Sequence, residues 1–252
     1  MLFLFALLGP FLVHYNPRAI ALQNGLQTPN AAHWLGCDSN GTDILAILAY
    51  GAKISLGIGV TATLICLSIG LLLGSIAGFF GGKIDATLMR FLEIIFAFPG
   101  IILAIALASL LRPGYGNLIL CLVATGWAGY ARLVRGEIKN LIQVEYVEAA
   151  KALGVNSWRI IVRHLWPNIT STLMVSATFG LAGMILAEAS LSFLGVGVPP
   201  GTPSWGSLLS AGKQVLVEAP HVASFPGFAV MLAVLSFNLL GEGLREWLDP
   251  KN

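Results

Sequence analysis

The chain has 252 residues, of which 56% are hydrophobic and only 10% are charged, whereas a soluble domain carries about 25% charged residues. Its mean hydropathy of +0.82 therefore excludes an ordinary soluble protein and indicates several membrane crossings, and its net charge of +2 gives no sign of a nucleic-acid partner. A phosphate-binding loop requires Gly-Lys followed by Ser or Thr, and the sequence contains no such triplet. The chain therefore has no visible means of binding ATP itself.

Apolar stretches along the chain predict an all-α membrane protein with six transmembrane helices, folded as a single domain over 1–252. A helix needs about 20 apolar residues to cross a bilayer. Five stretches have that length, namely 55–79, 91–111, 117–135, 172–190 and 224–242. The first apolar stretch, 2–13, is only about half as long. We therefore expect a truncated first helix, whose N-terminal half precedes Met1.

The distribution of basic residues predicts the orientation of these helices. If the chain starts inside, the cytoplasmic segments are 80–90, 132–171 and 243–252, and they contain ten Lys and Arg residues against four in the outer segments. Loops rich in Lys and Arg stay in the cytoplasm. Residues 132–171 are therefore predicted to be cytoplasmic, and the outer loop is predicted at about 191–223.

Glycine and proline mark two features of the predicted spans. Gly70, Gly74 and Gly78 recur every four residues and form a ridge that lets two helices approach closely. We expect this ridge to pack inside the subunit rather than at a subunit interface. Pro99 lies within the third span and is expected to bend it.

Between the fourth and fifth spans the chain becomes charged and amphipathic. The spacing predicts one helix over 140–153, with Tyr146, Ala150 and Leu153 on a shared face. Gly154 is placed to end this helix in the left-handed conformation.

A second amphipathic helix is expected after this corner, capped by Asn156 or Ser157. Its predicted apolar stripe consists of Trp158, Ile161, Val162 and Leu165. Arg159 and Arg163 share another face, and Pro167 is expected to end the helix.

Two roles fit such a pair of short helices. They can lie on the lipid headgroups with the arginines toward anionic lipid, or they can fill a groove on a cytosolic partner. Periodicity alone does not separate the two.

Few residues in the spans could bind a metal or carry out chemistry. Cys37, Cys66 and Cys121 form no CxxC pair, so neither a metal site nor a disulfide framework is expected. Glu188 is an ionisable residue near the end of the fifth span, which makes it either a candidate for the substrate pathway or a hydrogen-bonded structural residue.

The sequence "EAAKALG", followed by a proline thirteen residues after its glycine, resembles the EAA loop of binding-protein-dependent ABC importer permeases. Glu148, Ala149, Ala150, Gly154 and Pro167 match the motif. Histidine and tryptophan, at positions 164 and 166, replace its isoleucine and leucine.

Further blocks are similar to the dipeptide, oligopeptide and nickel branch of this family, specifically its C-type subunit. They include "GGKIDATLMRFLEIIFAFPG", "GWAGYARLVRGEI", "ILAEASLSFLGVGVPPGTPSWGSLL" and "FNLLGEGLREWLDP". The block "LGCDSNGTDIL" also matches, except that Thr42 stands where the family has arginine.

This resemblance implies a multi-pass subunit of the bacterial inner membrane that forms half of a translocation pathway and is not itself an enzyme. It implies a homologous permease subunit, two ATPases that bind ATP and magnesium, and an external substrate-binding protein as partners, with no metal or cofactor on this chain. The coupling loop would be about 137–168. Its implied ATPase-coupling residues are Glu148, Ala149, Ala150, Gly154, Ser157, Arg159 and Pro167, and the pathway candidates are Glu188 and Pro99.

The resemblance suggests di- or oligopeptides as cargo, with nickel or a metal chelate as the alternative. Two other classes of membrane protein fit the sequence less well. A secondary transporter would need several charges at mid-membrane and an internal repeat, and neither is visible. A structural subunit of a larger complex would leave the EAA spacing to chance.

Overall fold

The computed structural model describes residues 2–13 and 15–248, and these are almost entirely helical. Its elements are α1 (Leu2–Leu12), η1 (Leu22–Asn24), α2 (Ile44–Phe80), α3 (Gly82–Phe96), α4 (Gly100–Leu110), α5 (Tyr115–Leu141), α6 (Glu145–Ala152), α7 (Ser157–Ile160), η2 (Ile161–Leu165), α8 (Trp166–Phe193), α9 (Trp205–Gln214) and α10 (His221–Leu248). The described residues contain no strand, only an isolated bridge between Cys37 and Asp43. The predicted all-α membrane fold is confirmed.

Each of the five long apolar stretches corresponds to a helix or to a bent pair of helices. Among the described residues, four helices are long and apolar enough to cross a membrane, and α3 with α4 makes a fifth if the pair is one span bent by 83°. The predicted bend at Pro99 is confirmed. The helix α1 has 11 residues.

Helix α2 begins eleven residues before the predicted start of its span. Asp43 accepts a hydrogen bond from the backbone N–H of Ala46 at 2.8 Å, so its carboxylate satisfies a free donor of the first turn. The exposed Lys53 interrupts the apolar stretch without ending the helix. A prediction that looks for a stretch of sequence without charges therefore places the start of α2 after Lys53, which is too late.

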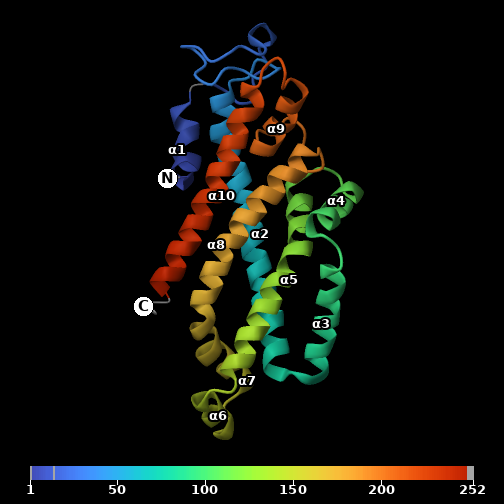
Figure 1. Cartoon of the computed structure of the whole chain (residues 1–252), viewed down its shortest axis with the longest axis vertical. Coiled ribbons are helices and arrows are strands. Elements are labelled where there is room, and N and C mark those ends of the chain that lie inside the picture. Colours follow the sequence, from blue (N-terminus) through green and yellow to red (C-terminus); the bar gives the residue numbers. More distant parts are fainter. Residues whose placement is uncertain (1, 14, 249–252) are drawn as a thin grey trace. The chain divides into compact units, whose positions relative to one another are not determined.

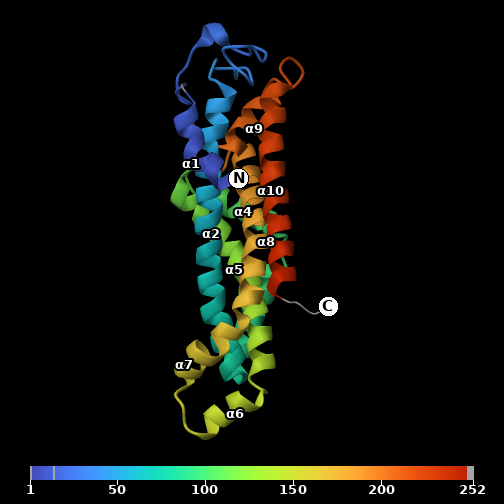
Figure 2. The same cartoon turned by 90° about the vertical axis from the view of Figure 1, so that its left-hand side faces the viewer.

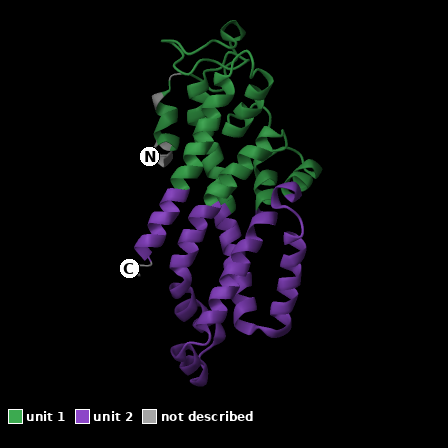
Figure 3. Ribbon diagram, viewed as in Figure 1, with its two compact units in different colours: residues 1–62, 104–122, 181–237 green, residues 63–103, 123–180, 238–252 purple. Residues whose placement is uncertain are grey.

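The chain forms two compact units, and each takes part of the same long helices (Figure 3). The first unit consists of 1–62, 104–122 and 181–237. Its core includes Ile44, Leu56, Ile185 and Trp205, all nearly inaccessible to solvent. The Trp205 indole N–H donates to the Leu48 carbonyl at 3.0 Å, which anchors α9 on α2.

An N-terminal cap, residues 15–43, belongs to the first unit. Its Leu26 and Leu35 pack against the core, and a His221 ring nitrogen lies 3.1 Å from the Gln27 carbonyl. The cap, α9 and the start of α10 lie at the same end of this unit (Figure 1).

The second unit consists of 63–103, 123–180 and the described residues from 238 onward. Its core joins the end of α5 to the segment between α5 and α8, with Val134, Ile138, Ile160, Ile161 and Leu165 fully buried. Within this unit, α6 lies beyond the end of α5, and α7 runs on through η2 into α8 (Figures 1 and 2).

The glycine ridge of α2 packs against α5 inside the second unit. A methyl group added at Gly74 would lie 2.6 Å from the Ala131 carbonyl oxygen, and one at Gly78 would lie 2.9 Å from Ile138 Cβ. The prediction that this ridge packs within the subunit is confirmed.

Candidate functional site

The chain turns a sharp corner between α6 and α7, and this corner is built by backbone hydrogen bonds. The Gly154 N–H donates to the Lys151 carbonyl at 3.0 Å, and the Val155 N–H donates to the Ala150 carbonyl at 3.1 Å. These two bonds form a Schellman motif, which requires a left-handed residue after the helix. Gly154 has φ = +72°, so its predicted conformation is confirmed.

The second helix of the pair starts as predicted. The Asn156 side chain accepts a hydrogen bond from the Trp158 backbone N–H at 2.9 Å, so it is the N-cap of α7. We call residues 145–167 the corner segment.

The faces of the corner segment differ from those predicted. In α6 the buried side chains are Val147 and Ala150, whereas Tyr146 and Leu153 are exposed, Leu153 to 84%. The helix begins at Glu145 rather than at 140, because α5 continues to Leu141 and a turn follows. Because the helix starts later than predicted, a different set of side chains faces the core.

The same correction applies after the corner. Ile161 and Leu165 are buried as predicted, and Ile160 joins them, but Trp158 and Val162 are about half-exposed. A π-helical turn over Ile161–Leu165 shifts the angular position of each side chain relative to an α-helix. The tip of the corner segment thus presents the exposed apolar side chains of Leu153, Trp158 and Val162.

The implied ATPase-coupling residues differ in their exposure along this segment. Glu148, Ala149, Arg159 and Pro167 are exposed, Ser157 is partly exposed, and Ala150 is buried. Among the described residues, neither Glu148 nor Arg159 forms an ion pair. Both charges are therefore available to a partner, and the roles of these residues in coupling stay predictions.

Pro167 does not end the helix, contrary to the prediction. Helix α8 begins at Trp166 and runs through Pro167 without interruption. Proline lacks an N–H group and is tolerated in the first turn of a helix. The π-turn before it is closed by a bond from the Trp166 N–H to the Ile161 carbonyl.

Two contacts fix the corner segment on α2, and a third lies within the segment. The Trp166 indole N–H donates to Ser75 Oγ at 3.0 Å, and Ser75, on the glycine-ridge helix α2, is fully buried. The Lys151 ammonium lies 5.3 Å from the ring centroid of Phe79, a cation–π distance. The rings of Tyr146 and His164 lie 6.3 Å apart. The segment is therefore held by α2 as well as by its neighbours in sequence.

A buried ionic cluster that sequence reasoning missed joins α3 to α5. Asp85, in the first turn of α3, accepts hydrogen bonds from two guanidinium nitrogens of Arg135 and, at 2.5 Å, from the Lys139 ammonium. Positive-inside counting uses only the number of basic residues, so it could not reveal that two of them are paired. The only available signal was a lone aspartate amid basic residues.

Glu188 is fully buried in the first unit. Ser192 Oγ donates to Glu188 Oε1 at 2.8 Å, and Ser55 lies close enough to interact with the carboxyl. Pro99, in contrast, is exposed between α3 and α4. Glu188 belongs to the first unit and Pro99 to the second, and their pathway role stays a prediction.

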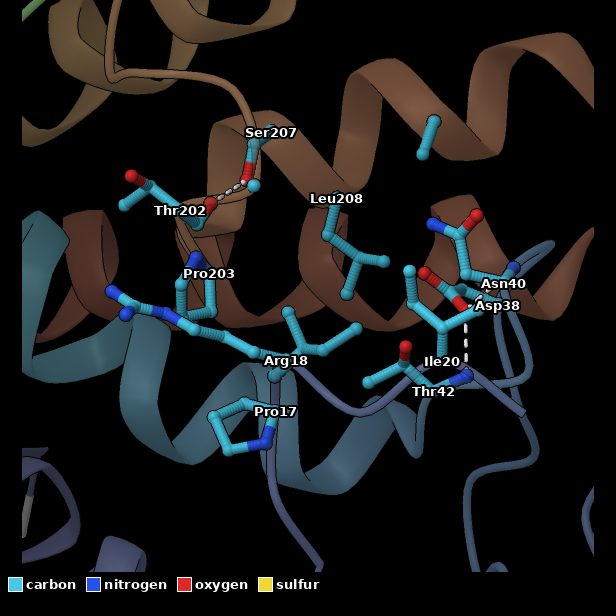
Figure 4. Close-up of a pocket in the computed structure, with 13 residues that line it drawn as sticks. Pro17, Arg18, Ile20, Asp38, Asn40, Thr42, Thr202, Pro203, Ser207 and Leu208 are labelled. Carbon is cyan, nitrogen blue, oxygen red and sulfur yellow. Dashed lines mark hydrogen bonds between the residues drawn. The ribbon is translucent and has the colours of Figure 1, made fainter.

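A pocket of about 370 Å³ lies in the first unit, between the N-terminal cap and the start of α9. In Figure 4 the Arg18 side chain extends along Pro203, while Asp38 and Asn40 lie on the opposite wall. The wall is rigid because Asp38 accepts a hydrogen bond from the Thr42 backbone N–H at 2.8 Å. Thr42, at the position of the family's arginine, donates its hydroxyl to the Ala19 carbonyl at 2.8 Å.

Comparison with known proteins decides the family. Residues 70–252 match the family model described as "Binding-protein-dependent transport system inner membrane component". The chain belongs to this family. The permease is thus a subunit of a binding-protein-dependent ABC importer and a multi-pass protein of the bacterial inner membrane.

Curated relatives narrow the branch. The permease is 44% identical over 223 residues to the glutathione transport system permease protein GsiD of Pectobacterium atrosepticum, which covers 88% of this chain and 74% of that protein. It is 41% identical to the dipeptide transport system permease protein DppC of Alkalihalophilus pseudofirmus, over 98% of this chain and 82% of that one. These relatives are transport permeases rather than enzymes.

A solved structure supports the fold. The permease resembles a chain of the MetNI methionine ABC transporter in an inward-facing conformation with a TM-score of 0.62, over 81% of this chain and 96% of that one. Their sequence identity is 19%, so the likeness concerns the fold alone. The predicted importer family is confirmed.

Proposed function

We propose that this permease forms half of the pathway of a di- or oligopeptide importer and that its corner segment docks in a groove of a cytosolic ATPase subunit. A homologous permease subunit, two ATPases and an external binding protein would complete the assembly. ATP and magnesium would bind to the ATPases. The observation that carries the coupling role is the exposed apolar tip formed by Leu153, Trp158 and Val162 on a corner whose backbone is fixed.

The exposed apolar side chains of the tip support docking, because a partner that covered them would remove them from water. Leu153 is 84% exposed, although the neighbouring Val147 and Ala150 are buried. A short helix that offers apolar anchors beside charged residues fits the helix-in-groove mode. A lipid-surface role is less favoured for α6, since this helix lies beyond the end of α5 (Figure 2).

Rigidity supports the coupling role further. ATP binding can shift the permease between two states only through interactions that differ between those states. A segment tied to α2 through Trp166 and Ser75 can pass a displacement into the helix bundle, because its internal hydrogen bonds keep its shape. A flexible loop would absorb the same displacement.

Peptide cargo is supported by the relatives, whose names specify dipeptides and glutathione. Nickel remains the alternative cargo. No group of three or more His, Cys, Asp or Glu among the described residues could hold a metal ion, yet binding proteins select the cargo in such importers, so this does not exclude nickel. Calorimetry with the purified external binding protein, comparing dipeptides, glutathione and nickel, tests the cargo directly.

For the first unit we propose that the pocket lined by Arg18 and the connection between α9 and α10 contact the external binding protein. Val217, in that connection, is 99% exposed, and Arg18 is exposed, with no side-chain partner among the described residues. Exposed apolar residues and arginines are both typical of protein-binding surfaces.

Two matched substitutions separate the two docking surfaces. Leu153→Asp should abolish co-purification of the ATPases and leave binding-protein capture intact, because it places a charge on the docking tip. Val217→Asp should weaken stimulation by the loaded binding protein and leave the ATPases bound. Full ATPase co-purification and normal uptake in Leu153→Asp would refute the proposed docking.

A further inference from the structure

A cavity between α8 and α10 in the second unit has a different character from the corner segment. It measures about 290 Å³ and is lined by Ser171, Thr172, Val175, Arg245 and Leu248. The two helices meet next to it, because a methyl group added at Gly241 would lie 3.1 Å from the Phe179 ring. The cavity therefore has two packed helices as its walls.

Its polar groups are donors without partners. Arg245 forms no ion pair or hydrogen bond within the described chain, and the same holds for the hydroxyls of Ser171 and Thr172, which are half-buried. By contrast, the hydroxyls of Thr170 and Thr178 on the same helix donate to the carbonyl four residues back, at 2.9 and 2.8 Å. A guanidinium and two hydroxyls that converge on one cavity favour an anion with several acceptor oxygens.

Among the described residues, no carboxylate lines this cavity. Glu242 and Glu246 flank Arg245 in α10 and are exposed, but neither lines the cavity and neither pairs with Arg245 in the part of the chain that the structure describes. The anion site thus keeps its charge, although the two glutamates reduce the long-range attraction.

The place of the cavity along α10 is compatible with the depth of lipid headgroups when the middle of this helix is set at the bilayer centre. At about 1.5 Å per residue, Arg245 lies roughly 16 Å from the middle of α10, and the hydrocarbon core of a bilayer extends about 15 Å from its centre. The neighbouring Trp247 is 76% exposed, as expected of a side chain in an interfacial aromatic belt. Toward the membrane centre, Met174 and Leu239 are exposed on the two helices.

We propose that this cavity binds the phosphate group of an anionic phospholipid, with the guanidinium of Arg245 and the hydroxyls of Ser171 and Thr172 as donors. The acyl chains would lie along the exposed apolar side chains of α8 and α10. A free phosphate ion offers the same oxygens, but it would not use the apolar surface next to the cavity. A bound lipid would bridge α10 to the helix that leaves the corner segment, whichever cargo the importer carries.

Lipid retention on the purified permease–ATPase assembly tests the proposal. Native mass spectrometry would compare phosphatidylglycerol with diacylglycerol of the same chains, which lacks the phosphate. Arg245→Gln should weaken phosphatidylglycerol retention about tenfold, the loss expected for one charge-assisted contact. The paired substitution Ser171→Ala with Thr172→Val should weaken it less, and Arg90→Gln, which removes an exposed charge of α3, should change it by less than about twofold.

Each variant would first be checked for an intact assembly by size-exclusion chromatography, and the hydroxyl variant keeps the test open if Arg245→Gln does not assemble. Equal losses in Arg90→Gln and Arg245→Gln would overturn the proposal, because they would indicate general surface charge. Equal retention of diacylglycerol would overturn the role of the phosphate. Complete displacement of the lipid by millimolar inorganic phosphate would overturn the lipid as the ligand.

Discussion

Replacing Gly154 with valine should uncouple the corner segment from transport while leaving the permease in the membrane. Gly154 has φ = +72°, a region that costs a residue with a Cβ about 1–2 kcal/mol, and β-branching adds to this cost. No atom lies within 4 Å of the position that its Cβ would take. The penalty therefore comes from the backbone alone and not from a clash.

The magnitude follows from the two bonds of the Schellman motif. They hold the corner only while residue 154 stays left-handed, and about 1.4 kcal/mol shifts an equilibrium tenfold. A cost of about 1–2 kcal/mol lowers the population of the native corner roughly five- to thirtyfold relative to competing conformations. We therefore expect peptide uptake to fall by about tenfold, with normal amounts of permease in the membrane.

The matched control is Gly154→Asn, because asparagine tolerates the left-handed region better than other residues with a side chain. It should keep most of the uptake, and Gly154→Ala should fall between the two. The assay combines uptake of a labelled dipeptide in cells with co-purification of the ATPases. If Gly154→Val transports as well as Gly154→Asn, the angle of the corner does not matter for coupling. If valine instead removes the permease from the membrane, the corner serves folding.

Four further outcomes test the packing, the orientation and the reactivity of a buried thiol. Gly74→Val should lower the free energy of unfolding by about 1–3 kcal/mol, because it overpacks the α2–α5 contact, and the melting temperature should fall. The control Gly57→Val should leave the melting temperature unchanged, because a Cβ at Gly57 would meet nothing within 4 Å. Asp85→Asn should also lower the melting temperature, by an amount equivalent to about 1–3 kcal/mol, because it leaves two partly buried cations without their carboxylate; an unchanged melting temperature would show that the cluster is not stabilising. Ser157→Cys should react with an impermeant maleimide only in permeabilised cells, and labelling from outside would reverse the topology. The native Cys37 should stay unreactive at pH 7 and react faster as the pH rises, because burial and two nearby aspartates raise its thiol pKa to about 11.

Features that depend on the local backbone could be predicted from the sequence. The left-handed Gly154, the Asn156 cap and the break at Pro99 each follow from the conformational limits of one residue and its neighbours. The family assignment was equally accessible, since it rests on residue identities at fixed spacing.

Features that depend on long-range packing could not be predicted in this way. Ser75 and Trp166 are 91 positions apart, and nothing near either residue announces their hydrogen bond. The prediction of the buried face of α6 was wrong because the start of this helix depends on where α5 ends. The prediction that Pro167 ends a helix was wrong because a π-turn precedes it and the proline occupies the first turn of α8. Proline alone does not indicate whether a helix ends or begins.

The break between α3 and α4 has a consequence for biogenesis. The carbonyls of Phe96, Ala97 and Phe98 accept no backbone hydrogen bond within the described chain, and these residues are exposed. Hydrocarbon cannot satisfy such groups, and each one left unpaired there costs several kcal/mol. Water or another subunit must therefore meet them. A permease synthesised without its partners would expose this defect to lipid, so we expect orphan copies to be short-lived and to be recognised by membrane proteases at this point.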